Sequence, residues 1–292
     1  TPLLFSLNEA KQHLLWSTPF ARNYKTNHPK KVEKWEIKPV TFSDYNKGFD
    51  LIQKHIHFGD SFLLNYTQPS PVSCNLSLEQ IFHSSPALYK IYLKDSFACF
   101  SPEIFIRIDN RKISSFPMKG TIDAAIPNAR VIIKNDRKEL AEHNTIVDLI
   151  RNDISIVADQ VEVEKFRYID QINTNRGELL QMSSQISGVL PENHMEQIGT
   201  IIFNMLPAGS ISGAPKPKTV ELIKKVENYT RGFYTGVFGY FDGNNLDSCV
   251  LIRYIENQNG QLVYKSGGGI THLSNCQSEY EEMIKKVYVP IT

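Results

Sequence analysis

Four glutamates of this sequence form two pairs with the same spacing, and each pair falls in a predicted amphipathic helix. The pairs are Glu139 with Glu142 and Glu279 with Glu282. Residues three apart lie on the same face of a helix. Carboxylates that join an apolar face need a cation, a proton or a metal ion to balance their charge. Two such pairs on separate helices therefore indicate an Mg²⁺ site, which needs only a few carboxylates and several waters.

Each of these helices also allows a simpler interpretation. In the first helix, both acids share one stripe with Ile146, Leu149 and Asp153. In the last helix, both acids share a face with Met283 and Lys286. Acidic residues in a first helical turn also suit the helix dipole, and either helix alone could present an ordinary solvated face. The argument for a metal depends on the two pairs together.

Three further segments have the composition of a ligand site. Residues 209–217 form a Gly/Ser-rich loop before a predicted helix, where an anion can bind, although the loop lacks the GxxxxGK[ST] pattern of a P-loop. Arg253 lies in an apolar segment, predicted as a strand from 248 to 256, where it either pairs with a core acid or faces an anionic ligand. The three glycines at 267–269 allow close approach of the backbone to a ligand, but they are also typical of a flexible loop.

Composition narrows the class of protein. The chain has 292 residues, of which 41% are hydrophobic and 22% are charged, and its net charge is +1. These values are typical of a globular protein with a large core, and they give no reason to expect nucleic-acid binding. The four cysteines are widely scattered, and no apolar run is long enough to span a bilayer. We therefore expect a cytoplasmic protein that does not enter a membrane.

Strand patterns dominate the chain, and helices interrupt them without a βαβ rhythm. This favours an α+β fold with large antiparallel sheets. Residues 1 to about 42 look poorly organised. We predict a strand at 154–158 and a helix at 178–187, among other elements.

Several ordered motifs together resemble the chorismate-utilising enzymes, from about Ser43 to the end of the chain. The family includes anthranilate synthase component I, aminodeoxychorismate synthase component I, and the isochorismate and salicylate synthases. The resemblance implies one chorismate-binding catalytic domain over residues 1–292, with large antiparallel sheets facing each other and helices outside. The motifs are FPMKGT, KELAEHNTIVDLIRND, GSISGAPK, RGFYTGVFGYFDG with IRY, SGGGI, and SEYEEMIKK.

Within this family the chain is most similar to the aminodeoxychorismate synthase component I branch, because Lys119 stands where anthranilate synthases usually have Ala. The resemblance implies that the Lys119 amine attacks ring carbon C2, that the C4 hydroxyl leaves, and that ammonia then adds at C4. This chemistry needs a neutral amine, which burial or a neighbouring cation can supply by lowering the lysine pKa. Isochorismate and salicylate synthases place a water-activating lysine where this chain has Leu63, so addition of water is not expected.

The resemblance also implies roles for the acids. Glu142 and Glu282 match acids that bind Mg²⁺ directly, whereas Glu139 and Glu279 match acids that bind its waters. The ion would bind the ring carboxylate of chorismate. Glu103, which alone would be taken for an ordinary turn acid, matches a general acid that protonates the departing hydroxyl.

Other matching positions would bind the substrate. Arg253, Tyr234 and Lys286 match groups that contact the two carboxylates of chorismate, and an arginine can bind a carboxylate in a bidentate way. The hydroxyl of Ser210 and the backbone of Gly267, Gly268 and Gly269 would supply further hydrogen-bond donors.

Two departures from the family pattern affect these expectations. Residues 181–184 read Gln-Met-Ser-Ser where many relatives have His-Leu-Val-Ser, so the contribution of that histidine has no counterpart here. Relatives also have a longer N-terminal region with a tryptophan pocket, so we expect no feedback by tryptophan. No Gly-x-Cys-x-Gly glutaminase motif is present, and ammonia would come from solution or from a separate glutamine amidotransferase subunit.

Two alternatives to C4 amination stay open. One is anthranilate synthase component I, which aminates C2 and eliminates pyruvate. The other is a non-catalytic subunit that binds chorismate. A Lys119→Ala variant distinguishes the first alternative, because it should lose C4 amination. Binding of chorismate without turnover, in the presence of ammonia and Mg²⁺, would indicate the second.

Overall fold

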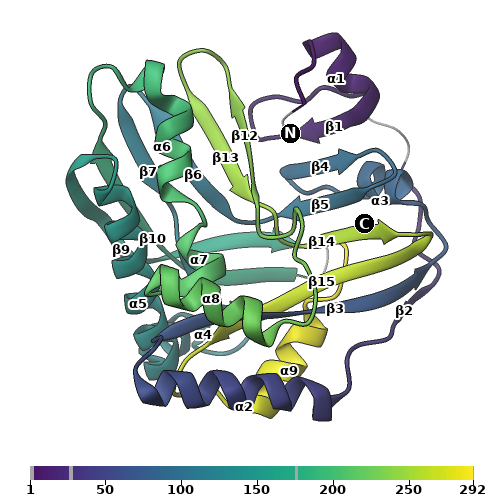
Figure 1. The fold of residues 1–292 in the computed structure, drawn as a ribbon, viewed down its shortest axis with the longest axis vertical. Coiled ribbons are helices and arrows are strands. Elements are labelled where there is room, and N and C mark those ends of the chain that lie inside the picture. Colours follow the sequence, from purple (N-terminus) through teal and green to yellow (C-terminus); the bar gives the residue numbers. More distant parts are fainter. Residues whose placement is uncertain (1–2, 26–28, 175–176, 292) are drawn as a thin grey trace.

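Two antiparallel β-sheets form the centre of the molecule (Figure 1). The computed structural model describes residues 3–25, 29–174 and 177–291. In the first sheet, β3 (Leu63–Cys74) lies between β15 (Gln261–Ile270) and β11 (Gly213–Ala214). The first residues of β3 belong to the candidate site described below. The strands of this sheet in spatial order are β1 (Leu14–Ser17), β4 (Tyr89–Leu93), β5 (Phe97–Ser101), β14 (Tyr254–Gln258), β15 (Gln261–Ile270), β3 (Leu63–Cys74) and β11 (Gly213–Ala214), with β2 (Trp35–Ile37) beside β3.

The second sheet is built around the long strand β10 (Gly177–Val189). One edge of β10 pairs with β7 and β8 in turn, and the other edge pairs with β9. The remaining strands continue the sheet beyond β7. In spatial order the strands are β12 (Val237–Phe241), β13 (Leu246–Val250), β6 (Ile104–Asp109), β7 (Lys112–Ser115), β10 and β8 (Met118–Asp123), with β9 (Asp159–Thr174) beside β10.

The two sheets face each other across a hydrophobic layer. Side chains of the first sheet, among them Ile91 and Cys99, pack there against Cys249 of the second sheet and Leu251, which follows β13 (Leu246–Val250). Every strand pair in the described part of the chain is antiparallel. The α+β architecture expected from the sequence is confirmed.

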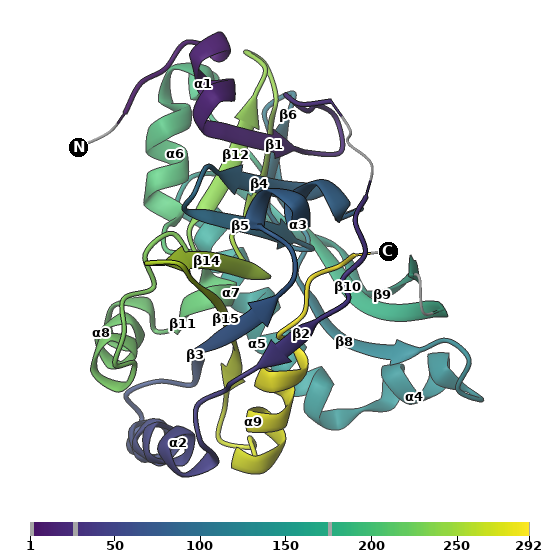
Figure 2. The same ribbon diagram turned by 90° about the vertical axis from the view of Figure 1, so that its right-hand side faces the viewer.

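Helices cover the outer faces of both sheets (Figures 1 and 2). Apolar faces of α2, α8 and α9 form one core with β3 and β15, whereas α5, α6 and α7 pack on the second sheet. No helix in the described residues is long and apolar enough to span a membrane. The helices are α1 (Leu7–His13), α2 (Phe42–Phe58), α3 (Leu78–Ser84), α4 (Ala129–Asn135), α5 (Arg137–Ser155), α6 (Ile198–Met205), α7 (Gly209–Ser212), α8 (Lys216–Val226) and α9 (Cys276–Lys285).

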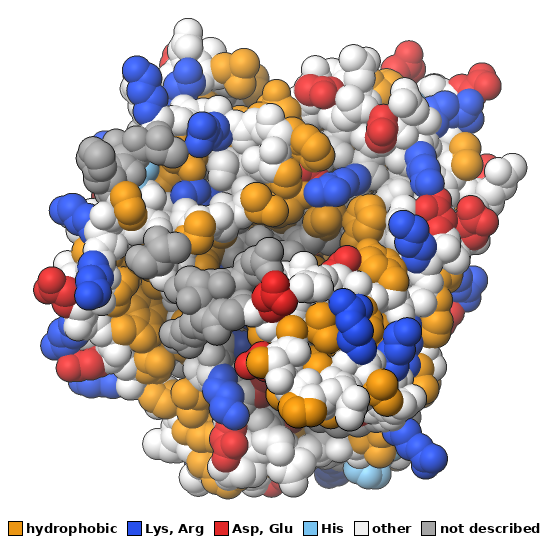
Figure 3. All heavy atoms as spheres, turned by 180° about the vertical axis from the view of Figure 1, so that it is seen from behind, with side chains coloured by type: hydrophobic (Ala, Val, Ile, Leu, Met, Phe, Trp, Pro, Cys, Tyr) orange, Lys and Arg blue, Asp and Glu red, His pale blue; other side chains and the backbone are white. Residues whose placement is uncertain are grey.

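Charged side chains are distributed over the surface. Figure 3 shows that Lys and Arg side chains are interspersed with Asp and Glu side chains on the face opposite to that of Figure 1. This distribution agrees with the net charge of +1, and the visible face has no extended basic surface of the kind that binds nucleic acid.

Several local predictions were wrong. Residues 178–187 form strand β10 rather than a helix, because neighbouring strands pair with both of its edges and Leu180, Met182 and Ile186 are buried at alternate positions. The strand predicted at 154–158 is instead the end of α5 and the turn after it. The region 1–42 contains α1, β1 and β2, so it is more ordered than expected.

Candidate active site

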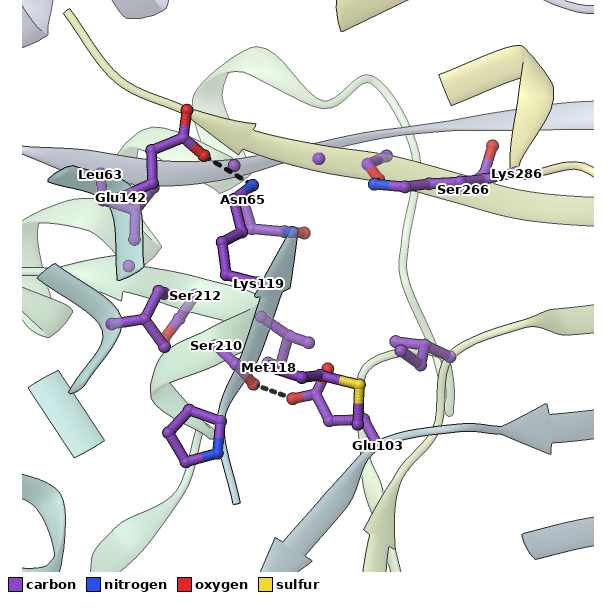
Figure 4. Close-up of a pocket in the computed structure, with 18 of the residues that line it drawn as sticks. Leu63, Asn65, Glu103, Met118, Lys119, Glu142, Ser210, Ser212, Ser266 and Lys286 are labelled. Atoms are coloured by element: carbon purple, nitrogen blue, oxygen red, sulfur yellow. Dashed lines mark hydrogen bonds and ion pairs between the residues drawn. The ribbon is translucent and has the colours of Figure 1, made fainter. Parts of the chain in front are cut away.

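A cavity of about 170 Å³ lies between the two sheets, and most of the predicted site residues line it (Figure 4). β3 and β15 form one wall, and β8, α5 and α7 contribute to the others. The predicted residues in its lining are Glu103, Lys119, Glu142, Ser210, Tyr234, Arg253, Gly267, Gly268, Gly269 and Lys286. The three remaining predicted residues, Glu139, Glu279 and Glu282, lie close by but outside this lining.

Lys119 extends from β8 into the cavity and forms an ion pair with α5. Its Nζ lies 2.6 Å from Oε2 of Glu142, a carboxylate whose side chain is only 4% exposed. Burial disfavours the charged amine, but the nearby carboxylates of Glu142, Glu139 and Glu282 outweigh it and raise the Lys119 pKa above its ordinary value. The shift is therefore opposite to the one expected for a neutral nucleophile. In this arrangement the lysine is a cation among acids.

Glu103 lies at the other end of the cavity, in the turn between β5 and β6. Burial raises the pKa of its carboxyl, while a hydrogen bond from the Ser210 hydroxyl acts in the opposite direction. A carboxyl with a raised pKa can hold a proton for transfer to a leaving group. Ser210, which was predicted to bind substrate, thus contacts the predicted acid directly.

The loop that carries Ser210 is fixed to the end of α5. Lys216 Nζ lies 2.7 Å from Oδ1 of the buried Asp153 and donates a hydrogen bond of 3.0 Å to the carbonyl of Met205. Gly213 has a φ of +126°, and a Cβ there would lie only 1.9 Å from the carbonyl oxygen of Leu63. Glycine is therefore required where this loop joins the sheet as β11.

The three glycines at 267–269 belong to strand β15, where they pair with β3. They are not a flexible loop. A Cβ on Gly267 would lie only 2.1 Å from the carbonyl oxygen of Tyr66, so glycine is required there, whereas a Cβ on Gly268 would make ordinary contacts of 3.4 Å with Glu279 Oε2 and 3.6 Å with Lys286 Nζ. Lys286 lies 2.6 Å from Glu282 and donates a hydrogen bond of 2.9 Å to the carbonyl of Gly267.

Arg253 lies where the chain crosses from one sheet to the other. The strand predicted at 248–256 is divided into β13 and β14, which belong to different sheets, and Arg253 between them has a left-handed φ of 54°. Its guanidinium lies 5.3 Å from the centre of the Tyr288 ring. Its buried Nε has no hydrogen-bond partner among the described residues. Tyr234 and Arg253 both line the cavity, so the guanidinium lies where a ligand in the cavity can contact it.

The acids predicted to hold Mg²⁺ come from two helices, one pair from α5 and one pair from α9. Glu139 and Glu142 lie beside β8, and Glu279 and Glu282 lie over Gly268. Within the described residues, no three acidic, His or Cys side chains are close enough together to surround a metal ion. Mg²⁺ usually binds through one or two carboxylates and keeps several waters. One or two of these carboxylates with several waters would be a suitable donor set for the ion, and the Lys119 amine at 2.6 Å from Glu142 shows that a cationic group has access to one of them.

Some residues of the site were not predicted from the sequence. Asn65, Lys265 and Ser266 line the cavity beside Leu63. The alternation of side chains along a strand would have placed Asn65 on the same face as Leu63. Gln181, at the position where relatives have histidine, donates a hydrogen bond of 2.8 Å to the sulfur of Met118.

His143 is fully buried next to the acids, and its Nε2 lies 2.7 Å from the Ser184 hydroxyl. Burial lowers its pKa to about 4, with a further contribution from the positive charges of Arg167 and Lys119. The imidazole is therefore neutral at neutral pH, and it fixes α5 to β10 by a hydrogen bond rather than by charge.

Comparison with known proteins agrees with this geometry. A sequence profile of the chorismate binding enzyme family matches residues 5–292. The chain is 50% identical over 269 residues to an uncharacterized PabA-like protein of Pasteurella multocida, an alignment that covers 92% of this chain and 83% of that protein. It is 30% identical to aminodeoxychorismate synthase component 1 of Bacillus subtilis, covering 86% of this chain but only 55% of the relative.

A solved structure shows the same fold. Anthranilate synthase component I from Streptococcus pneumoniae superposes with a TM-score of 0.74 at 25% sequence identity, covering 87% of this chain and 58% of that one. The match of the family profile over nearly the whole chain shows that this protein belongs to the chorismate binding enzyme family.

Proposed function

We propose that this enzyme converts chorismate and ammonia to 4-amino-4-deoxychorismate, as an aminodeoxychorismate synthase component I on the route to para-aminobenzoate and folate. The observation that carries the proposal is the position of Lys119 in the cavity, beside Glu142 and across from Glu103. A lysine that becomes nucleophilic once it is deprotonated and a carboxyl with a raised pKa would then face the same substrate.

In this mechanism the Lys119 amine, once deprotonated, attacks ring carbon C2. The C4 hydroxyl takes a proton from Glu103 and leaves as water. Ammonia then forms a bond to C4 while the bond between C2 and the lysine nitrogen breaks, and the new C4 ammonium group loses a proton that returns to the Glu103 carboxylate. The lysine is regenerated, and the enolpyruvyl group stays on the ring.

Binding and orientation of the substrate are proposed to come from the residues around these two groups. Arg253 and Lys286 supply positive charge for the carboxylates of chorismate, with Tyr234 beside them. The backbone of β15 at 267–269 allows the ring to approach closely. The four acids Glu139, Glu142, Glu279 and Glu282 would hold Mg²⁺, which when bound would supply positive charge for the ring carboxylate.

Ammonia is proposed to come from a separate glutamine amidotransferase subunit, or from solution in its absence. The support for a partner is that relatives of this chain are named as component 1 of aminodeoxychorismate synthase.

Mass spectrometry of the product tests the proposal. The chain is incubated with chorismate, Mg²⁺ and ammonium at mildly alkaline pH. An amino product that retains the enolpyruvyl group is expected. Formation of anthranilate would instead assign C2 amination with loss of pyruvate. Binding of chorismate without turnover would assign the non-catalytic role.

A further inference from the structure

The side chain of Asn65 is a polar group of the cavity to which neither the motifs nor the proposed mechanism gives a role. Along β3, Leu64 and Tyr66 are buried in the core that α2, α8 and α9 form with the sheet. Because side chains alternate along a strand, Leu63 and Asn65 point to the opposite face, where both line the cavity. Figure 4 shows them at the Lys119 end, away from Glu103.

The amide oxygen of Asn65 lacks a hydrogen-bond donor in this structure. Its Oδ1 is buried and has no partner among the described residues. The backbone at this position is fixed, since Arg231 donates a hydrogen bond of 2.7 Å to the Asn65 carbonyl and is itself paired with the buried Glu227 at 2.7 Å. An unsatisfied buried acceptor on a rigid strand is costly unless a ligand or an ordered water supplies the donor.

The lysines of the cavity are committed to other acceptors. Lys265 lies 2.9 Å from Glu256, Lys286 lies 2.6 Å from Glu282, and Lys119 lies 2.6 Å from Glu142. None of these three lysines is therefore a donor to Asn65 in its present pairing, and we look for the donor among the reactants or in a lysine that has left its carboxylate.

We propose that Asn65 Oδ1 is the acceptor for an N–H of the neutral amine that attacks the ring. This inference rests on the proposed function. The carboxylates of chorismate offer no donor, and its C4 hydroxyl faces Glu103 in the proposed mechanism, at the other end of the cavity from Asn65 (Figure 4). An amide does not remove protons at neutral pH, so it suits a nucleophile that already carries a lone pair and has an N–H to donate. Two sources supply this chemistry, free ammonia and the deprotonated side chain of Lys119.

Asn65→Leu tests the proposal, because it removes the amide and keeps the size of the side chain. We would measure rates of amination against ammonium concentration at fixed pH, and chorismate affinity by calorimetry with Mg²⁺. We expect kcat/KM for ammonia to fall at least about tenfold, because the loss of one hydrogen bond of about 1.4 kcal/mol corresponds to a factor of about ten. A raised KM for ammonia would identify ammonia as the donor, and a reduced kcat at saturating ammonia would identify Lys119.

The matched control is Gln68→Leu, which removes an amide from the same strand outside the cavity, where Gln68 donates to the Tyr66 hydroxyl. Gln68→Leu should leave kcat and KM for ammonia within about twofold of the wild-type values. Asn65→Ala serves if the Leu variant does not fold.

Two results would overturn the proposal by itself. In the first result, the wild type aminates chorismate and the folded Asn65 variants have kcat and KM for ammonia within about twofold of the wild-type values. This result would show that the reaction does not use the Asn65 amide. A tenfold weaker affinity for chorismate with unchanged ammonia kinetics would assign the amide to the substrate hydroxyl. A wild-type chain that forms no aminated product would overturn the proposed function and this inference with it.

Discussion

The ion pair between Asp153 and Lys216 joins the end of α5 to the loop that carries Ser210. The two charged atoms lie 2.7 Å apart, and the Asp153 side chain is 6% exposed. Removing one partner of a buried pair leaves the other charge without compensation. We therefore expect Asp153→Ala to lower the free energy of unfolding by about 3 kcal/mol, measured by urea denaturation.

Asp148→Ala is the control for this prediction, because it breaks an ion pair of the same length, 2.7 Å, on the same helix at an exposed position. The free energy of unfolding of Asp148→Ala should fall by less than about 1 kcal/mol. If both variants lose the same free energy of unfolding, burial does not determine how much the Asp153 ion pair stabilises the protein.

Ser210→Ala should change the pH dependence of turnover through Glu103. The Ser210 hydroxyl stabilises the charged carboxylate and so opposes the rise in pKa that burial causes. Without it the pKa of Glu103 rises further. A general acid works only while protonated, so the limb on which kcat falls with increasing pH should move to higher pH. Ser212→Ala is the control, because that hydroxyl donates to the Ala208 carbonyl at 2.8 Å and not to Glu103. A limb that stays in place, or moves to lower pH, would exclude Glu103 as the acid.

Helix α5 shows which features of the site the sequence pattern predicts and which it does not. Glu142 was placed on an apolar stripe by spacing alone, and it is 4% exposed in the structure. Periodicity within one helix predicts which face is buried. It does not predict what lies opposite that face, so the pairing of Glu142 with Lys119 required the structure.

Arg253 and β10 show where local patterns fail. Residues 248–256 read as one apolar strand, yet the chain turns at Arg253 through a left-handed φ and enters the other sheet. No glycine or proline marks this turn. The 178–187 segment was predicted as a helix, but pairing with three neighbouring strands overrides its local preference. In both cases long-range pairing decides the structure.

Glu282→Gln tests the proposed metal site. Glu282 faces Gly268 and Lys286, whereas its neighbour Glu281 is exposed and accepts a hydrogen bond of 2.8 Å from Gln277. The Mg²⁺ concentration for half-maximal activity should rise at least about tenfold in Glu282→Gln, because one carboxylate ligand loses its charge. Glu281→Gln should change it by less than about twofold. Similar Mg²⁺ dependence in both variants would remove Glu282 from the metal site, and activity that survives chelation would remove the metal from the mechanism.

Lys119→Arg separates the charge of the lysine from its nucleophilicity. A guanidinium can keep the ion pair with Glu142, but it stays protonated and cannot attack C2. Formation of 4-amino-4-deoxychorismate should therefore fall by about three orders of magnitude or more, measured by mass spectrometry. Lys119→Ala should show the same loss without the ion pair, and its thermal unfolding shows how much the pair contributes to stability. If either variant aminates C4 at the wild-type rate, the covalent mechanism is wrong. If anthranilate appears instead, ammonia can reach C2 once the lysine no longer occupies it.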